Sequence, residues 1–153
     1  MGLAEIRAAL MLAIDGIVPS SASQHAFTRL DPTDPRAFED IAVEAPRVYD
    51  LQRTGGNADT GLLSDGAAPE EVEFELLLTV GYPLAAFRGR DLAWEAMTQD
   101  EIALTGALRP VSVWTSDAAD VAVSNDNDVS PVIGADGPVA FIVSIPIIVR
   151  YRP

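Results

Sequence analysis

The chain has 153 residues, a length typical of one domain that buries roughly two-thirds of its unfolded surface in a single core. Its 23 acidic residues outnumber 10 basic ones, and the formal net charge of −13 repels phosphates and anionic lipid. Direct, specific nucleic-acid binding is therefore disfavoured. The chain has no cysteine, which excludes disulfides and thiol chemistry. We expect a single domain over residues 1–153.

The N-terminal segment lacks the features of an export signal. Glu5 and Arg7 precede a short apolar stretch that stops at Asp15, so the segment has no basic start followed by a clean apolar run. No other segment approaches the roughly 20 apolar residues that a membrane helix requires. We expect a protein that is made and used without export and has no membrane partner.

The first third of the chain predicts one helix followed by irregular structure. Apolar residues recur at helical spacing over 3–17, which predicts an amphipathic helix. Ser, Pro and Asp dominate 18–38, which predicts a loop with one short extended piece at 27–30. Residues 39–53 contain β-branched and aromatic side chains and Pro46, and predict a strand pair or one strand interrupted near the proline.

A long polar segment and a clear strand follow. Residues 54–70 are rich in Gly, Pro and small polar side chains and predict a long hairpin loop that projects from the domain. Loops of this length inside compact domains are usually functional or disordered. Residues 72–83 alternate between an apolar and a mixed face, which predicts a long strand.

The next segment predicts a helix over 91–108. Asp91 is a candidate N-cap, and a capping box at 98–101 predicts either a break or a second start within this helix. After it, 111–116 and 120–124 predict short strands.

The C-terminal segment predicts a hairpin. A tight-turn signal at 136–137 joins a strand at 129–134 to a long final strand at 139–151. The final strand contains Pro146, whose missing backbone donor predicts a sheet edge or a bulge at that position.

Together these elements predict an α+β fold: an antiparallel β-sheet with two α-helices packed on one face and a long projecting hairpin loop. Pairing the two long strands with Glu73 opposite Arg150 would bring Glu71 next to Arg152 and direct the apolar set to the helices. Trp94 and Trp114 are expected to anchor either the core or an interface; we favour the core, because aromatic side chains supply much of the buried area of a small domain.

No catalytic, cofactor-binding or metal-binding constellation is found. His25, the only histidine, lies in a Ser-rich loop without an orienting partner. The acidic turn from Asn125 to Asp128 lacks the Gly and Glu positions of an EF-hand loop, so we favour a solvated turn over a cation site. Glu73 and Glu75 share one strand face without sugar-stacking aromatics, which disfavours a glycosidase dyad.

The order of elements resembles the tail terminator and head–tail joining proteins of long-tailed bacteriophages. The resemblance covers most of the chain as a pattern of elements, without a signature motif. It depends on four segments: the helix LAEIRAALMLAI, the strand VEFELLLTVGYP, the helix RDLAWEAMTQDEIALTGAL and the terminal strand FIVSIPIIVRYRP.

The resemblance implies a structural virion protein and no enzyme. Copies would close into a hexameric ring in the tail or neck of the virion, after assembly in the host cytoplasm. The ring would cap the tail tube, end tube polymerisation and join the head connector or stopper protein, while DNA passes through without specific binding. Candidate residues for the contact with another copy or with the tube are Pro146, Arg150, Arg152, Glu73, Glu75, Asn57, Asp59 and Asp65.

Three alternatives stay open. Within the same class, the chain would be a head–tail connector or a tail tube subunit. From another class, it would be a small ligand-binding or enzymatic α+β domain. A third alternative is a cellular module that recognises peptides by adding them to the edge of a sheet.

Overall fold

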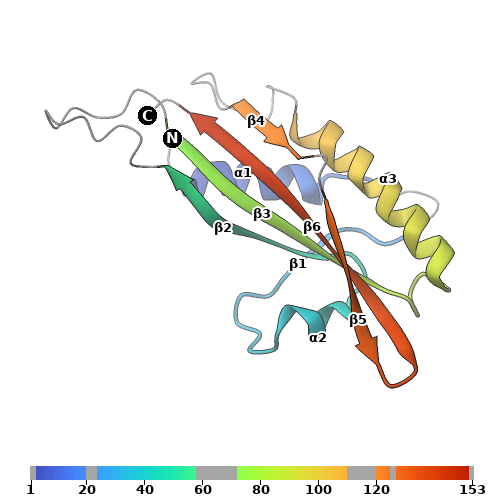
Figure 1. Cartoon of the computed structure of the whole chain (residues 1–153). Helices are drawn as coiled ribbons and strands as arrows, with labels where there is room; N and C mark the ends of the chain where they lie inside the picture. Colours follow the sequence, from blue (N-terminus) through green and yellow to red (C-terminus); the bar gives the residue numbers. More distant parts are fainter. Residues whose placement is uncertain (1–2, 20–23, 58–71, 110–119, 125–126, 152–153) are drawn as a thin grey trace, which may run out of the picture.

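The structure, a computed structural model, describes residues 3–19, 24–57, 72–109, 120–124 and 127–151. This part of the chain has an α+β fold with three helices and one six-stranded mixed sheet (Figure 1). The α+β prediction is therefore confirmed. In chain order the elements are α1 (Leu3–Asp15), β1 (Thr28–Arg29), α2 (Phe38–Ala42), β2 (Val48–Asn57), β3 (Val72–Pro83), α3 (Arg90–Leu108), β4 (Asp120–Val123), β5 (Asp128–Gly134) and β6 (Gly137–Tyr151).

The strand order is β1-β2-β3-β6-β4, and β5 pairs with β6 beside β4. Every described pair is antiparallel, as predicted, except β1 with β2, which makes the sheet mixed. The cause is the connection: α2 lies between β1 and β2 and carries the chain back to the same end of the sheet, as a parallel pair requires.

The predicted register of the two long strands is confirmed. Glu73 lies opposite Arg150, and the antiparallel pairing continues without a shift from Val72 opposite Tyr151 to Pro83 opposite Ala140. The predicted neighbours Glu71 and Arg152 lie outside the described residues.

Pro146 does not lie at a sheet edge or in a bulge, so that prediction is wrong. It sits opposite Leu77 on β6, which has β3 on one side and β4 and β5 on the other. On the second side β5 pairs only as far as Ser144 and β4 pairs only from Ile147. The Pro146 carbonyl accepts a hydrogen bond of 2.9 Å from Ser124 N at this junction, which places the ring nitrogen on the same side. The ring nitrogen, which lacks an N–H, therefore faces the gap between β4 and β5. Its lack of a donor costs the sheet no hydrogen bond between paired strands.

Two helices, α1 and α3, cover one face of the sheet, as predicted; α1 lies behind the strands in the view of Figure 1. Strand alternation directs one apolar set of the sheet to this face. The buried core combines Ile6, Leu10 and Ile14 of α1, Ala93, Met97 and Leu104 of α3, and Tyr49, Leu51, Leu76, Leu78, Val80, Val143, Ile145 and Ile147 of the sheet.

Helix α3 differs from its predicted form. It runs unbroken from Arg90 to Leu108, and its N-cap is Gly89 at φ 119°, so neither a cap at Asp91 nor a second start at Thr98 is present. The Thr98 hydroxyl instead donates to the Trp94 carbonyl of the preceding turn at 3.0 Å. Trp94 itself is 44% exposed, so its predicted core position is wrong, and Trp114 lies outside the described residues.

A third helix, α2, packs on the opposite face of the sheet. A strand was predicted to begin at residue 39, but helix occupies Phe38–Ala42 and β2 starts only at Val48. Glu39 and Asp40 lie in the first turn of α2, where the helix dipole favours negative charge. Ala42 lies so close to Gly81 of β3 that a Cβ built on that glycine would come within 2.7 Å of the Ala42 Cβ.

Gly81→Ala is expected to lower the free energy of unfolding by about 1–3 kcal/mol, because the added methyl overpacks the contact with α2. Urea unfolding followed by tryptophan fluorescence measures the change. Gly106→Ala in α3 is the matched control, since a Cβ there meets nothing within 4 Å. It should leave the stability equal or raise it by up to about 1 kcal/mol. Equal stability of the Gly81→Ala variant and the wild type would contradict the packing of α2 on this face.

The predicted loop 54–70 lies mostly outside the described residues. Its first residues, 54–57, belong to β2, which is bulged between Arg53 and Gly55. The predicted strand 111–116 also lies outside the described residues. Among the described elements, the β5–β6 hairpin extends beyond the rest of the domain at the lower end of Figure 1.

Candidate functional site

The second face of the sheet is mostly open in the described part of the chain. We call it the open face; its side chains project away from α1 and α3 because alternate residues of a strand point to opposite sides. Helix α2 covers only the end that contains Gly81 and Ile142. Along β2, β3 and β6 the open face carries Asp50, Gln52, Thr54, Glu73, Glu75, Leu77, Thr79, Ser144, Pro146, Ile148 and Arg150.

A groove of about 640 Å³ lies on the open face between α2 and β5. On the central strands β3 and β6 its floor combines the apolar Leu77 and Ile142 with the polar Thr79 and Ser144. Two acidic residues, Glu39 of α2 and Asp50 of β2, are also in its lining. This combination suits a partner with an apolar anchor and positive charge.

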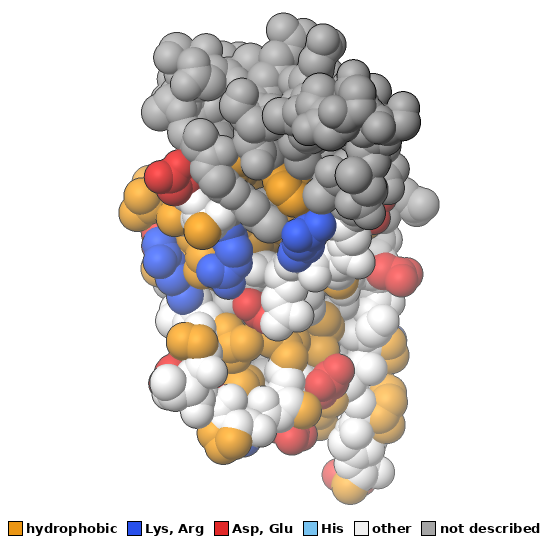
Figure 2. Space-filling model, turned by 90° about the vertical axis from the view of Figure 1, so that its left-hand side faces the viewer, with side chains coloured by type: hydrophobic (Ala, Val, Ile, Leu, Met, Phe, Trp, Pro, Cys, Tyr) orange, Lys and Arg blue, Asp and Glu red, His pale blue; other side chains and the backbone are white. Residues whose placement is uncertain are grey.

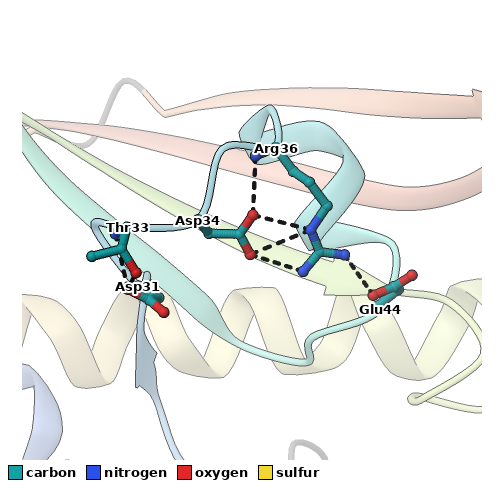
Figure 3. A network of polar contacts seen from close by, with 5 residues as sticks. All are labelled: Asp31, Thr33, Asp34, Arg36 and Glu44. Carbon is teal, nitrogen blue, oxygen red and sulfur yellow. Dashed lines mark hydrogen bonds and ion pairs between the residues drawn. The ribbon is translucent and has the colours of Figure 1, made fainter.

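The loop that carries α2 is held by a polar network (Figure 3). Asp31 accepts hydrogen bonds from the Thr33 hydroxyl and backbone N–H, and these bonds lower the pKa of its carboxyl group. Arg36 donates to Asp34 at 2.9 Å, which lowers the pKa of Asp34, and reaches across to Glu44 at 2.9 Å. Residues on both sides of α2, which forms this wall of the groove, are thereby linked at the surface.

A buried ion pair lies beneath the other end of this segment. Arg47 is 0% exposed and Asp100 of α3 is 1% exposed. The Arg47 Nε and Nη2 atoms donate to the two Asp100 oxygens at 3.0 and 2.7 Å. The Tyr82 hydroxyl donates to Asp100 Oδ2 at 2.7 Å, and the Arg47 guanidinium lies 3.7 Å from the centre of the Phe27 ring. Arg47 also donates to the His25 carbonyl.

This buried cluster is structural. Burial raises the pKa of Asp100, although the hydrogen bonds from Tyr82 and Arg47 lower it, and burial also raises the pKa of Tyr82. Because the charged groups are shielded from solvent, a substrate cannot reach them. They tie α3 to β3 and to the chain before β2. The sequence pattern did not predict this cluster. Asp100 nevertheless carries one signal, because it lies on the same helical face as the buried Met97 and Leu104.

The structure brings several of the predicted contact residues together on the open face. Arg150 Nε donates to Glu73 Oε2 at 2.8 Å, so this predicted neighbour pair is an ion pair. Glu75 and Pro146 are exposed on the same face, and Asn57 ends β2 opposite Glu73. The remaining predicted residues, Asp59, Asp65 and Arg152, lie outside the described residues.

A second hollow, a cleft of about 790 Å³, follows the outer side of β2 beside α1. Arg7 and Arg29 line it, and Figure 2 shows basic side chains gathered on this side of the molecule. Arg7 Nε donates to the outward carbonyl of Leu51 at 2.7 Å, and Leu30 N donates to the Tyr49 carbonyl at 2.8 Å. Two acceptors that an added strand would need are thus occupied, which protects this part of the edge from further pairing.

The described residues give little support for a metal site, a catalytic histidine, a cation-binding turn or a membrane-spanning helix. There, no group of three or more His, Asp or Glu side chains is placed to hold a metal ion. The His25 ring packs edge-on against Phe87 with centroids 5.8 Å apart. Asp128 of the acidic turn is exposed, while residues 125–126 lie outside the described part. Within the described ranges no helix is both long and apolar enough to cross a membrane.

Comparison with known proteins assigns no family. No protein-family model matches the chain, and no curated protein matches its sequence significantly.

Proposed function

We propose that this chain is a structural virion protein of the tail terminator kind. Its copies close into a hexameric ring that caps the tail tube, ends tube polymerisation and provides the joint to the head connector. The order of elements supports the proposal: α1, then β3, α3 and β6, the four segments on which the resemblance depends. A head–tail connector or tail tube subunit would share this architecture and differ in its position in the virion.

The open face is the observation that carries the proposal. An antiparallel sheet that faces water usually presents polar side chains there. Here the half-buried Leu77 lies opposite the exposed Pro146, and the half-buried Ile148 follows two residues later. With the groove beside them, these residues form an apolar centre surrounded by charged groups, an arrangement typical of protein–protein contacts.

The charge of the chain fits a ring around passing DNA. Tight binding to DNA requires Lys or Arg at the phosphates, because affinity comes from the release of counterions. With a net charge of −13, the ring would let the DNA slide without retaining it.

The size of the protein in solution tests this function. A hexamer of 16.2 kDa chains has a mass of roughly 100 kDa, and light scattering with electron-microscopic class averages should give rings of that size. A strict monomer at all concentrations would overturn the proposal.

A small ligand-binding or enzymatic domain is the second candidate, because the groove of about 640 Å³ is large enough for a small molecule. A monomer in which a small molecule binds the groove and protects the backbone amides of α2 from hydrogen exchange would favour this candidate.

A further inference from the structure

We propose that the groove on the open face receives the turn at the start of α3 from the next copy of the same chain. The inference rests on the self-association in the proposed function and deepens it, since it names the two surfaces that meet. We call the second surface the 88–94 turn, after its residues.

The 88–94 turn is mostly exposed and contains two arginines and one aspartate, Asp91, so its net charge is +1. Arg88 has φ 56°, a left-handed conformation that is uncommon for residues other than glycine. Arg90 is the first residue of α3, where the helix dipole disfavours positive charge. Both arginines are exposed, and neither forms an ion pair with another described residue. An acidic partner would offset the unfavourable positive charge at the start of α3.

The same turn carries an aromatic anchor. Trp94 is 44% exposed, and the covered part of its ring lies against Phe141, with the ring centroids 5.5 Å apart. Phe141 also has the Arg90 guanidinium 5.8 Å from its ring centre. Arg90 and Trp94 are therefore held side by side at the same end of α3. Tryptophan and arginine are the residues that most often dominate binding energy at protein interfaces.

The groove offers the complementary chemistry. Leu77 and Ile142 supply the apolar part of the floor for the indole ring, and Glu39 and Asp50 supply two carboxylates for the two guanidinium groups. Glu39 is exposed, and within the described ranges neither carboxylate takes part in an ion pair. Charge complementarity of this kind orients two partners and speeds their association.

The position of the two surfaces allows a ring. The groove lies on the open face, whereas α3 packs on the covered face, so one copy can use both surfaces at once. Such a contact is heterologous, and repeated rotation either closes it into a ring or extends it as a filament. The groove reaches Thr79 and Ile142, and the chain enters the 88–94 turn shortly after Pro83, so both surfaces lie near the same end of β3.

Paired charge reversals test the inference. One variant combines Arg88→Glu with Arg90→Glu, and the other combines Glu39→Arg with Asp50→Arg. Each double variant on its own places like charges where the 88–94 turn of one copy meets the groove of the next. Each should therefore form no rings and show at least tenfold weaker self-association in light scattering. An equimolar mixture restores opposite charges at both kinds of contact. Native mass spectrometry should then detect rings with equal numbers of the two chains.

Arg109→Glu is the matched control, because Arg109 is exposed at the other end of α3 and should not affect the rings. Rings that persist in both double variants would overturn the proposed contact and leave the ring itself standing. Double variants that stay apart when mixed, while circular dichroism shows them folded, would also overturn it. A wild-type chain that is monomeric at all concentrations would instead overturn the proposed function.

Discussion

Replacing Arg47 with alanine is expected to lower the free energy of unfolding by about 3–5 kcal/mol, the usual effect of removing one partner of a buried ion pair. The change leaves the Asp100 carboxylate buried with Tyr82 as its only described hydrogen-bond donor. It also removes the guanidinium from the Phe27 ring and from the His25 carbonyl. Denaturant unfolding followed by tryptophan fluorescence measures the difference. A loss of this size is a large part of the stability of an ordinary domain.

Two further variants separate the ion pair from the loss of packing. Arg47→Met with Asp100→Leu replaces both charges by apolar groups and should recover most of the stability, since a buried pair often contributes little over a well-packed apolar pair. Arg36→Ala is the matched exposed control: it removes two ion pairs at the surface and should change the stability little. If the free energy of unfolding of the Arg47→Ala variant lies within about 1 kcal/mol of the wild-type value, the buried pair does not stabilise the fold as proposed.

The parts of the fold that could be predicted from the sequence are those with a strong local period. The alternation in 72–83 and 139–151 predicted β3, β6 and their register. A shift by one residue would turn the whole apolar set to the open face, so the pattern allows few alternatives. Helices α1 and α3 were predicted for the same reason, because their apolar residues recur with the helical period.

The parts that were missed are set by contacts between distant residues. Helix α2 has only five residues, too short for a periodic signal, and it lies where Gly81 leaves room for Ala42. The position of Pro146 in an inner strand follows from the junction of β4 and β5, which local sequence does not show. Arg47 and Asp100 are 53 positions apart in the chain. The groove likewise combines α2 with four strands, so single-sequence patterns could not assemble it.

Adjacent leucines on β3 provide the sharpest test of the two-faced sheet. Leu78 is 0% exposed and lies between Leu51 of β2 and Ile145 of β6 on the covered face. Leu78→Ala should therefore lower the free energy of unfolding by about 2–5 kcal/mol, because it removes buried apolar contacts and leaves a cavity. The measurement is urea unfolding of the monomeric protein at low concentration.

Leu77→Ala is the matched change one residue earlier, and its expected effect differs in kind. Leu77 is half-buried on the open face opposite Pro146 and forms part of the groove floor. Its replacement should cost the monomer less than half as much stability as Leu78→Ala, since water or the surrounding side chains can fill the space. It should weaken self-association instead, because the apolar part of the floor would lose its contact with Trp94 of the next copy. Equal losses of monomer stability in the two variants would mean that both sheet faces are buried in one chain, and the open face could then not serve as a contact between copies.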